Sequence, residues 1–150
     1  MSLTGQLIDL IENKSIDNED IEVASWYLLD AIANIAAGLN TDQGRILRRW
    51  FLEEIPDTSR KVLFMGALMH ILEMDDLHRK SIVHPGCVVI PVVITIGMRL
   101  GISGRKMLEA AIKGFETCTR IGNSVGPAHY KSGTTLRPAE LSALRMPQAA

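Results

Sequence analysis

Apolar residues recur every three or four positions along most of the chain, which is the spacing of one face of an α-helix. The first such stripe, over residues 3–11, predicts a short helix. Asp17 can cap a second helix that ends near Gly38, and Thr41 can cap a third. In this third helix, we expect the apolar side chains, Ile46 among them, to face inward.

A fourth helix is expected to start near Ser59, after a break at residues 55–58, and to run through Met74. The polar run of residues 75–81 ends it, and the triplet HPG at 84–86 is typical of a turn. The sequence therefore places a polar loop between two apolar segments.

The next segment, residues 87–100, is ambiguous because its many β-branched residues favour a strand. Pro91 argues against a central strand but fits the first turn of a helix. The length of the apolar run also favours a helix. We therefore predict a helix here, closed by Gly101.

A last long helix, capped by Ser103, should stop at the glycines Gly122 and Gly126. Together these segments make about six helices without a convincing strand, which predicts an all-α domain built as a helical bundle. From residue 134 onward the periodicity is lost. We therefore divide the chain into a helical domain, 1–133, and a divergent tail, 134–150.

Charge and cysteine content narrow the class of protein. Sixteen basic and seventeen acidic residues leave a net charge of −1, without the basic excess that nucleic acid or an anionic membrane would attract. The most apolar run, 87–98, is too short to span a bilayer, and the N-terminus is not a signal peptide. Cys87 and Cys118 form neither a disulfide framework nor a zinc set. We expect a cytoplasmic protein with two buried thiols.

Three carboxylates, Glu73, Asp75 and Asp76, fall at the expected end of the fourth helix. There they face the negative end of the helix dipole, which should raise their pKa values and suit a general base. The alternative is a solvated turn neutralised by Arg79 and Lys80, or a cap for the next helix.

Three histidines lie in the same region. His70 sits in an apolar helix, where we expect it to be a core residue. His78 and His84 follow Asp75 and Asp76, which makes a metal site conceivable, but their spacing matches no helix-face pair of ligands and we expect no metal. His84 precedes Pro-Gly, and such a rigid turn can fix an imidazole as an acid or base.

The segment 126–133 (GPAHYKSG) places Tyr130 and Lys131 between glycines. Such side chains can bind a carboxylate or donate a proton. The alternative is an exposed connecting loop. The glycines do not match a phosphate-binding loop.

Several of these motifs occur together, and in the same order, in a known family. Over about residues 5–133, the chain resembles the 2-methylcitrate dehydratase family, also called MmgE/PrpD. The matching segments are LLD (28–30), HILEMDDLH (70–78), HPG (84–86), VIP (89–91), LGISG (100–104), RIG (120–122) and GPAHY (126–130).

The resemblance implies a large helical domain joined to a smaller α+β domain, in a homodimer that acts on di- and tricarboxylates. Family members include 2-methylcitrate dehydratase, cis-aconitate decarboxylase and iminodisuccinate epimerase. They move a proton next to a carboxylate without a metal or organic cofactor. By this resemblance His84 is the acid or base, and Asp75 and Asp76 match the acidic pair, with Asp75 orienting His84 or sharing its proton. The expected substrate contacts are Glu73, His78, Tyr130 and Lys131.

This chain departs from the family pattern at several positions. Glu73 replaces an aspartate, Leu77 replaces a threonine, and TTLRP (134–138) replaces an aromatic-His-Pro-Thr-Gly stretch. A lysine of the family's site has no counterpart, since family members are much longer. We therefore expect a truncated relative with impaired activity. The alternative is a non-catalytic helical dimerisation module left from a larger enzyme.

Overall fold

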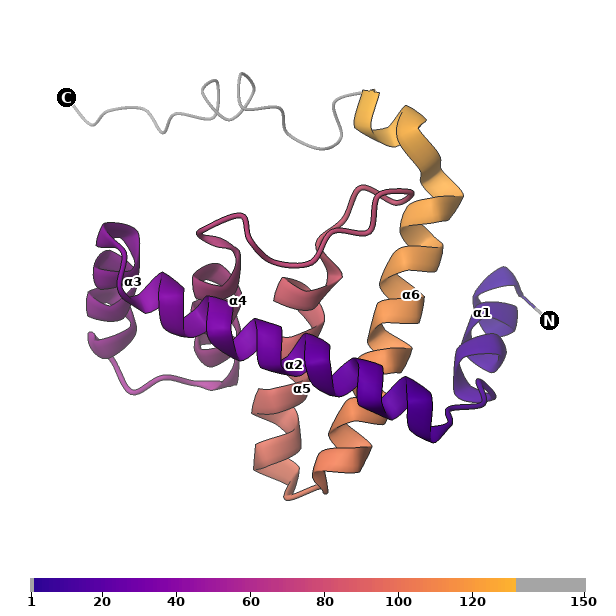
Figure 1. Cartoon of the computed structure of the whole chain (residues 1–150), viewed down its shortest axis with the longest axis horizontal. Coiled ribbons are helices and arrows are strands. Elements are labelled where there is room, and N and C mark those ends of the chain that lie inside the picture. The colour runs from indigo at the N-terminus through magenta and orange to yellow at the C-terminus, as the bar shows by residue number, and fades with distance from the viewer. Residues whose placement is uncertain (1, 132–150) are drawn as a thin grey trace.

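The computed structural model describes residues 2–131 and contains six α-helices and no strand in this range (Figure 1). The expected all-α bundle is confirmed. The expected tail, 134–150, lies outside the described residues. The helices are α1 (Leu3–Glu12), α2 (Asn18–Leu39), α3 (Asp42–Leu52), α4 (Thr58–His70), α5 (Pro85–Leu100) and α6 (Gly104–Lys131).

Side-chain caps mark the starts of α2, α3 and α4, and the first two of them, Asp17 and Thr41, are the residues that the sequence predicts. Asp17 accepts the N–H of Asp20 at 2.9 Å, and the two residues form a capping box at the start of α2. Thr41 accepts the N–H of Gly44 at 2.9 Å before α3, and Asp57 has the same role before α4. Each cap satisfies a backbone donor that has no partner inside the first turn.

Helix α2 crosses the front of α4, α5 and α6, with α3 and α1 near its two ends (Figure 1). The core lies at these crossings, where one buried residue from each of these four helices meets the others: Ala31 of α2, Met69 of α4, Ile90 of α5 and Ala111 of α6. Within residues 2–131, no helix has both the length and the apolar character needed to cross a bilayer.

Glycines let the helices approach one another closely. A Cβ added to Gly38 of α2 would lie 2.2 Å from the carbonyl oxygen of Leu68 in α4. A Cβ added to Gly66 of α4 would lie 2.7 Å from the carbonyl oxygen of Cys87 in α5. That carbonyl has no helical donor, because Pro91 stands one turn later and has no N–H. The contacts of α4 with α2 and α5 therefore depend on the absence of side chains.

The fourth helix is shorter than expected. It ends at His70 instead of Met74, although the apolar pattern continues beyond this point. Glu73 has a positive φ of 53°, a conformation that a continuing α-helix cannot contain. Residues 71–84 therefore form a longer loop between α4 and α5 than the sequence predicts.

Three other expectations are wrong in detail. Pro91 lies inside α5, and Pro85 holds the first-turn position expected for Pro91. Helix α6 continues through both Gly122 and Gly126 to Lys131, because each glycine costs a helix only about 1 kcal/mol. Ile46 of α3 is 57% exposed instead of facing inward.

We expect Gly38→Ala to lower the free energy of unfolding by about 1–3 kcal/mol, because the new methyl group would overlap the carbonyl of Leu68. Gly104→Ala is the matched control, since nothing lies within 4 Å of its Cβ position. Alanine there should leave the stability unchanged or raise it slightly. Urea unfolding, followed by circular dichroism, compares the two variants. Equal stabilities would contradict the close contact between α2 and α4.

Candidate active site

The loop between α4 and α5, residues 71–84, carries most of the expected site residues. An isolated antiparallel bridge holds residues 78–83 of this loop together, with the N–H of His78 donating to the carbonyl of Val83 at 2.9 Å. Helix α6 supports this part, because a Cβ added to Gly122 would lie 2.4 Å from the Cβ of Ser81. The loop is therefore packed against the bundle and is not the solvated turn considered as an alternative.

Asp76 holds the start of α5. Its two carboxylate oxygens accept the N–H of Gly86 at 3.1 and 3.2 Å. His84 makes no side-chain cap, so Asp76 satisfies a free donor of the first turn from the preceding loop. Burial raises the pKa of Asp76, and the bond from Gly86 opposes this rise. Asp76 thus lies at the positive end of α5, not at the negative end of α4, and burial rather than a helix dipole raises its pKa.

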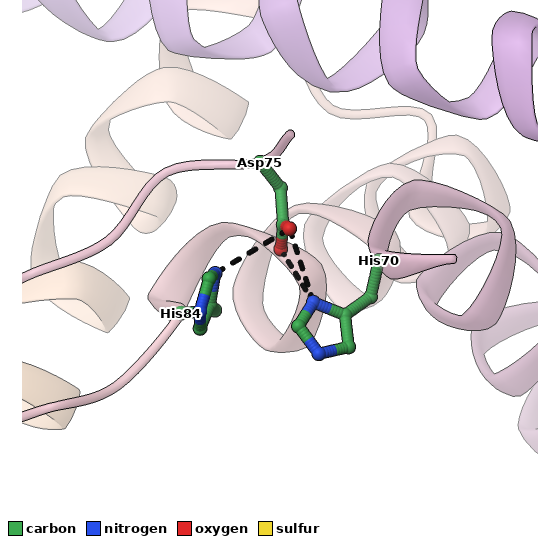
Figure 2. A group of neighbouring side chains, drawn as sticks. All are labelled: His70, Asp75 and His84. Atoms are coloured by element: carbon green, nitrogen blue, oxygen red, sulfur yellow. Dashed lines mark hydrogen bonds and ion pairs between the residues drawn. The ribbon is translucent and has the colours of Figure 1, made fainter. Parts of the chain in front are cut away.

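Asp75 lies at the centre of the site, between two histidine rings (Figure 2). Its side chain is fully buried, and both of its carboxylate oxygens lie 3.0 Å from Nδ1 of His70. Its Oδ1 also lies 3.4 Å from Nδ1 of His84. The two rings meet edge to face, with centroids 4.7 Å apart. One buried carboxylate therefore links the last residue of α4 to the residue before α5.

The chemistry of the groups decides which atom donates and which accepts in these contacts. An ionised carboxylate can only accept, so a ring nitrogen that faces Asp75 carries its hydrogen. Nδ1 of His84 is buried and forms no hydrogen bond in the described chain. The acceptor atom that it faces is Oδ1 of Asp75, at 3.4 Å. When the ring of His84 is neutral, its Nε2 then keeps a free lone pair. This arrangement suits a general base.

Glu73 and His78, two other expected site residues, have partners other than Asp75. The side chain of Glu73 is 73% exposed, with Oε1 3.5 Å from Nε2 of His70. Nδ1 of His78 pairs with the hydroxyl of Ser81 at 2.7 Å. Tyr130 and Lys131 lie in the last turn of α6, where the structure describes the backbone alone.

One member of this cluster, His70, was expected in the core and was not predicted as a site residue. The side chain of His70 is instead 40% exposed, at the last position of α4. Only the end of the helix at this residue lets the chain turn back and bring Asp75 to the ring. The signal available in the sequence was an aspartate five residues after the histidine, and its meaning depends on where α4 ends.

The same three residues could hold a metal ion. One donor atom from each of His70, Asp75 and His84 lies within 4.8 Å of the others. Two histidines and a carboxylate are a known ligand set for divalent transition metals. Hydrogen bonds and ion pairs among these side chains explain the short distances between their donor atoms without a metal. The expectation that no metal binds here stays a prediction.

Two cavities in the described structure lie away from this cluster. One of about 320 Å³ lies between α2 and α6, and one of about 610 Å³ lies among α3, α4 and α5. None of His70, Asp75 and His84 lines either cavity. The cluster reaches the surface through the two rings, which are 40% and 25% exposed.

Cys87, in the first turn of α5, is held as a thiol. Burial first, and then the charge of Asp75, raise the pKa of Cys87 to about 12. Burial also raises the pKa of Cys118. Both cysteines are free and partly buried, which supports the expectation of two unreactive thiols.

We expect Cys87 to react slowly with iodoacetamide in the folded protein. At about pH 9, a thiol with a pKa of about 12 is only about one-thousandth ionised, whereas half of an ordinary thiol with a pKa of 9.0 is ionised. Alkylation followed by peptide mass spectrometry should show a rate at least about 100-fold below that of Cys87 in the urea-unfolded chain. Similar rates in the two states would contradict the buried thiol.

Most of the sequence matches a known family model. The model of the MmgE/PrpD N-terminal domain matches residues 5–144. This match continues past residue 133, and the boundary expected there stays a prediction. No curated protein and no solved structure matches the sequence significantly. Because the family model covers most of its residues in one match, the chain belongs to the MmgE/PrpD family.

Proposed function

We propose that this chain moves a proton next to a carboxylate of a di- or tricarboxylic acid, as a lyase or isomerase similar to 2-methylcitrate dehydratase, with His84 as the base. The observation that carries the proposal is the position of Nδ1 of His84, 3.4 Å from the buried carboxylate of Asp75. A carboxylate behind Nδ1 orients the ring and stabilises the imidazolium that forms when Nε2 takes a proton. Membership of the family supports the class of substrate.

In the proposed step, the proton leaves the carbon next to the substrate carboxylate and binds to Nε2 of His84. In an isomerase, the electron pair is delocalised into that carboxylate and the proton returns to the carbon. In a lyase, the pair forms a double bond as a group leaves the neighbouring carbon. A general base contributes about 10²–10⁴-fold to such a rate. The step as proposed uses no metal and no organic cofactor.

The remaining expected residues have supporting roles in this proposal. Asp76 holds the first turn of α5 and with it the position of His84. Glu73 and His78 lie on the same loop and are candidates for contacts with substrate hydroxyl groups. The candidates for binding substrate carboxylates are Tyr130 and Lys131.

The proposal also includes the level of the activity and the cellular location of the protein. We propose a weaker activity than in relatives with the full set of site residues, since Leu77 replaces a threonine and TTLRP (134–138) replaces an aromatic-His-Pro-Thr-Gly stretch. A cytoplasmic location is also part of the proposal. Two free cysteines support it, because a reducing compartment keeps thiols unpaired.

Proton exchange in D₂O, followed by NMR, tests the proposed step with a panel of citrate, 2-methylcitrate, cis-aconitate and aspartate-type acids. We expect the proton next to a carboxylate of at least one acid to exchange. His84→Ala should slow this exchange by about 100-fold or more, because it removes the base. Asp75→Asn should also slow it, because His84 loses the charge behind Nδ1.

The matched control is Asp42→Asn, the same chemical change at an exposed carboxylate of α3 that pairs with Arg45. It should exchange protons as the unchanged chain does. Circular dichroism verifies that each variant is folded. The proposal is wrong if the folded wild type exchanges no proton of any acid, or if His84→Ala exchanges protons at the wild-type rate.

A second candidate function is that of a helical dimerisation module. Helix α2 exposes large apolar side chains at every third position over three turns. Contiguous exposed apolar surface is typical of protein interfaces, and a second copy of the chain is the simplest partner to cover it. The side chains that are each at least 50% exposed are Val23, Trp26, Leu29 and Ile32.

Sedimentation velocity tests this candidate. We expect the wild type to sediment as a dimer and Leu29→Glu to sediment as a monomer, because a charge on the apolar side of α2 opposes its burial. Ile55→Glu is the control, since Ile55 is 97% exposed in the loop before α4 and lies off this helix. A monomeric wild type that binds no hydrophobic dye would contradict the dimer.

A further inference from the structure

Helix α4 lies between α3 and α5 (Figure 1), and the larger of the two cavities is lined by these three helices. Its volume of about 610 Å³ is typical of a small-molecule binding site. None of the described residues that line it is an aspartate or a glutamate. Its lining consists of the apolar residues Phe51, Phe64, Met65, Ile94 and Met98 and the polar residues Thr58, Lys61, Thr95 and Arg99.

The apolar side chains of this cavity stay partly open to solvent. The rings of Phe51 and Phe64 are stacked, with centroids 4.3 Å apart and an angle of 14° between their planes. Met98, in the last turns of α5, is 72% exposed. Methionine is flexible and adapts its shape to a neighbouring group. Covering such a surface with an apolar ligand removes it from water, which is favourable.

The polar side chains come from the start of α4 and the end of α5. Thr58 and Lys61 lie three residues apart in α4, and Thr95 and Arg99 lie four residues apart in α5. Residues with this spacing are neighbours on one side of a helix. Nη1 of Arg99 lies 3.4 Å from Oγ1 of Thr58, a contact that joins the two pairs. The polar groups therefore gather where α4 begins and α5 ends.

Three of these polar groups lack the partners that such groups usually have. Lys61 and Arg99 form no ion pair within residues 2–131. Oγ1 of Thr95 is buried and forms no hydrogen bond in the same range, although most buried hydroxyl groups have a partner. Threonine in a helix has two common rotamers, so a rotation about χ1 can turn this hydroxyl toward a bound acceptor. Two cations without a nearby carboxylate attract an anion.

We propose that this cavity binds a small carboxylic acid with an apolar body, such as a medium-chain fatty acid. The carboxylate pairs with Lys61 and Arg99 and accepts the hydroxyl hydrogen of Thr95. The apolar body covers the stacked rings of Phe51 and Phe64. This inference does not rest on the proposed function, because no residue of the cavity has a role in the proton transfer. The substrates proposed there also differ, since they carry two or three carboxylates.

Isothermal titration calorimetry of the full chain at about pH 7.5 tests the proposal with octanoate. Octylammonium has the same apolar body with the opposite charge, and butanoate has the same charge with a shorter body. We expect octanoate to bind at least about 10-fold more tightly than octylammonium, since two cations attract one charge and repel the other. We also expect it to bind at least about 10-fold more tightly than butanoate, because each buried methylene adds up to about fourfold.

Equal affinities for octanoate and octylammonium would overturn the role of the cations, and equal affinities for octanoate and butanoate would overturn the role of the apolar surface. A folded chain that binds no octanoate overturns the whole inference, and this includes the case in which a second copy of the chain closes the cavity.

Charge-removing variants place the ligand in this cavity. We expect Lys61→Gln and Arg99→Gln each to weaken octanoate binding by about 2–5-fold and to reduce the preference over octylammonium. Lys106→Gln is the matched control, because Lys106 is an exposed lysine of α6 that does not line the cavity. It should bind octanoate as the wild type does. If Lys61→Gln and Arg99→Gln change only the stability and not the affinity, the inference is overturned.

Thr95→Val tests the buried hydroxyl, because valine has nearly the shape of threonine and cannot donate a hydrogen bond. We expect octanoate to bind about 2–10-fold more weakly. Urea unfolding gives the effect on stability, which should not fall, because the variant removes an unpaired buried group. An affinity equal to that of the wild type would overturn the contact between Thr95 and the carboxylate.

Discussion

The burial of one carboxylate, that of Asp75, governs the geometry of the candidate site. Asp75 can stay buried only if the loop turns back on the end of α4 and the start of α5, because its two partners lie there. Both partners are close to the core: Met69, which precedes His70, and Ile90, in the second turn of α5, belong to the buried cluster. The relative position of the two imidazoles therefore depends on how α4 and α5 pack.

Asp75 and Asp76 show how two adjacent residues of one type take different tasks. The carboxylate of Asp75 meets the imidazoles, and that of Asp76 meets the backbone N–H of Gly86. In the sequence the two look like a single acidic cluster. In the structure, one bonds to the start of the helix that follows His84, and the other lies beside the ring of His84.

Helix starts and the close of α5 were predictable because they depend on near neighbours. Asp17 and Thr41 cap the helices that follow them, and Gly101 ends α5 with a φ of 63°. The end of α4 was not predictable, because the apolar pattern continues while a tertiary contact, the one with Asp75, requires a turn. The same reason explains the site. His84 and Asp75 could be named from the family resemblance, whereas the contact of His70 with Asp75 emerges only once the helix is known to end there.

Pro91 gives α5 a further property. The proline supplies no N–H to the carbonyl of Cys87, and α4 approaches that carbonyl at Gly66, where no side chain stands between them. Helix formation is cooperative because each residue is held by bonds to the turns on either side. The first turn of α5 is joined to the rest of the helix by one bond fewer, so its position depends more on contacts outside the helix. The residue proposed as the base thus precedes a turn that is held from outside, by the carboxylate of Asp76 and by the close contact with α4 at Gly66.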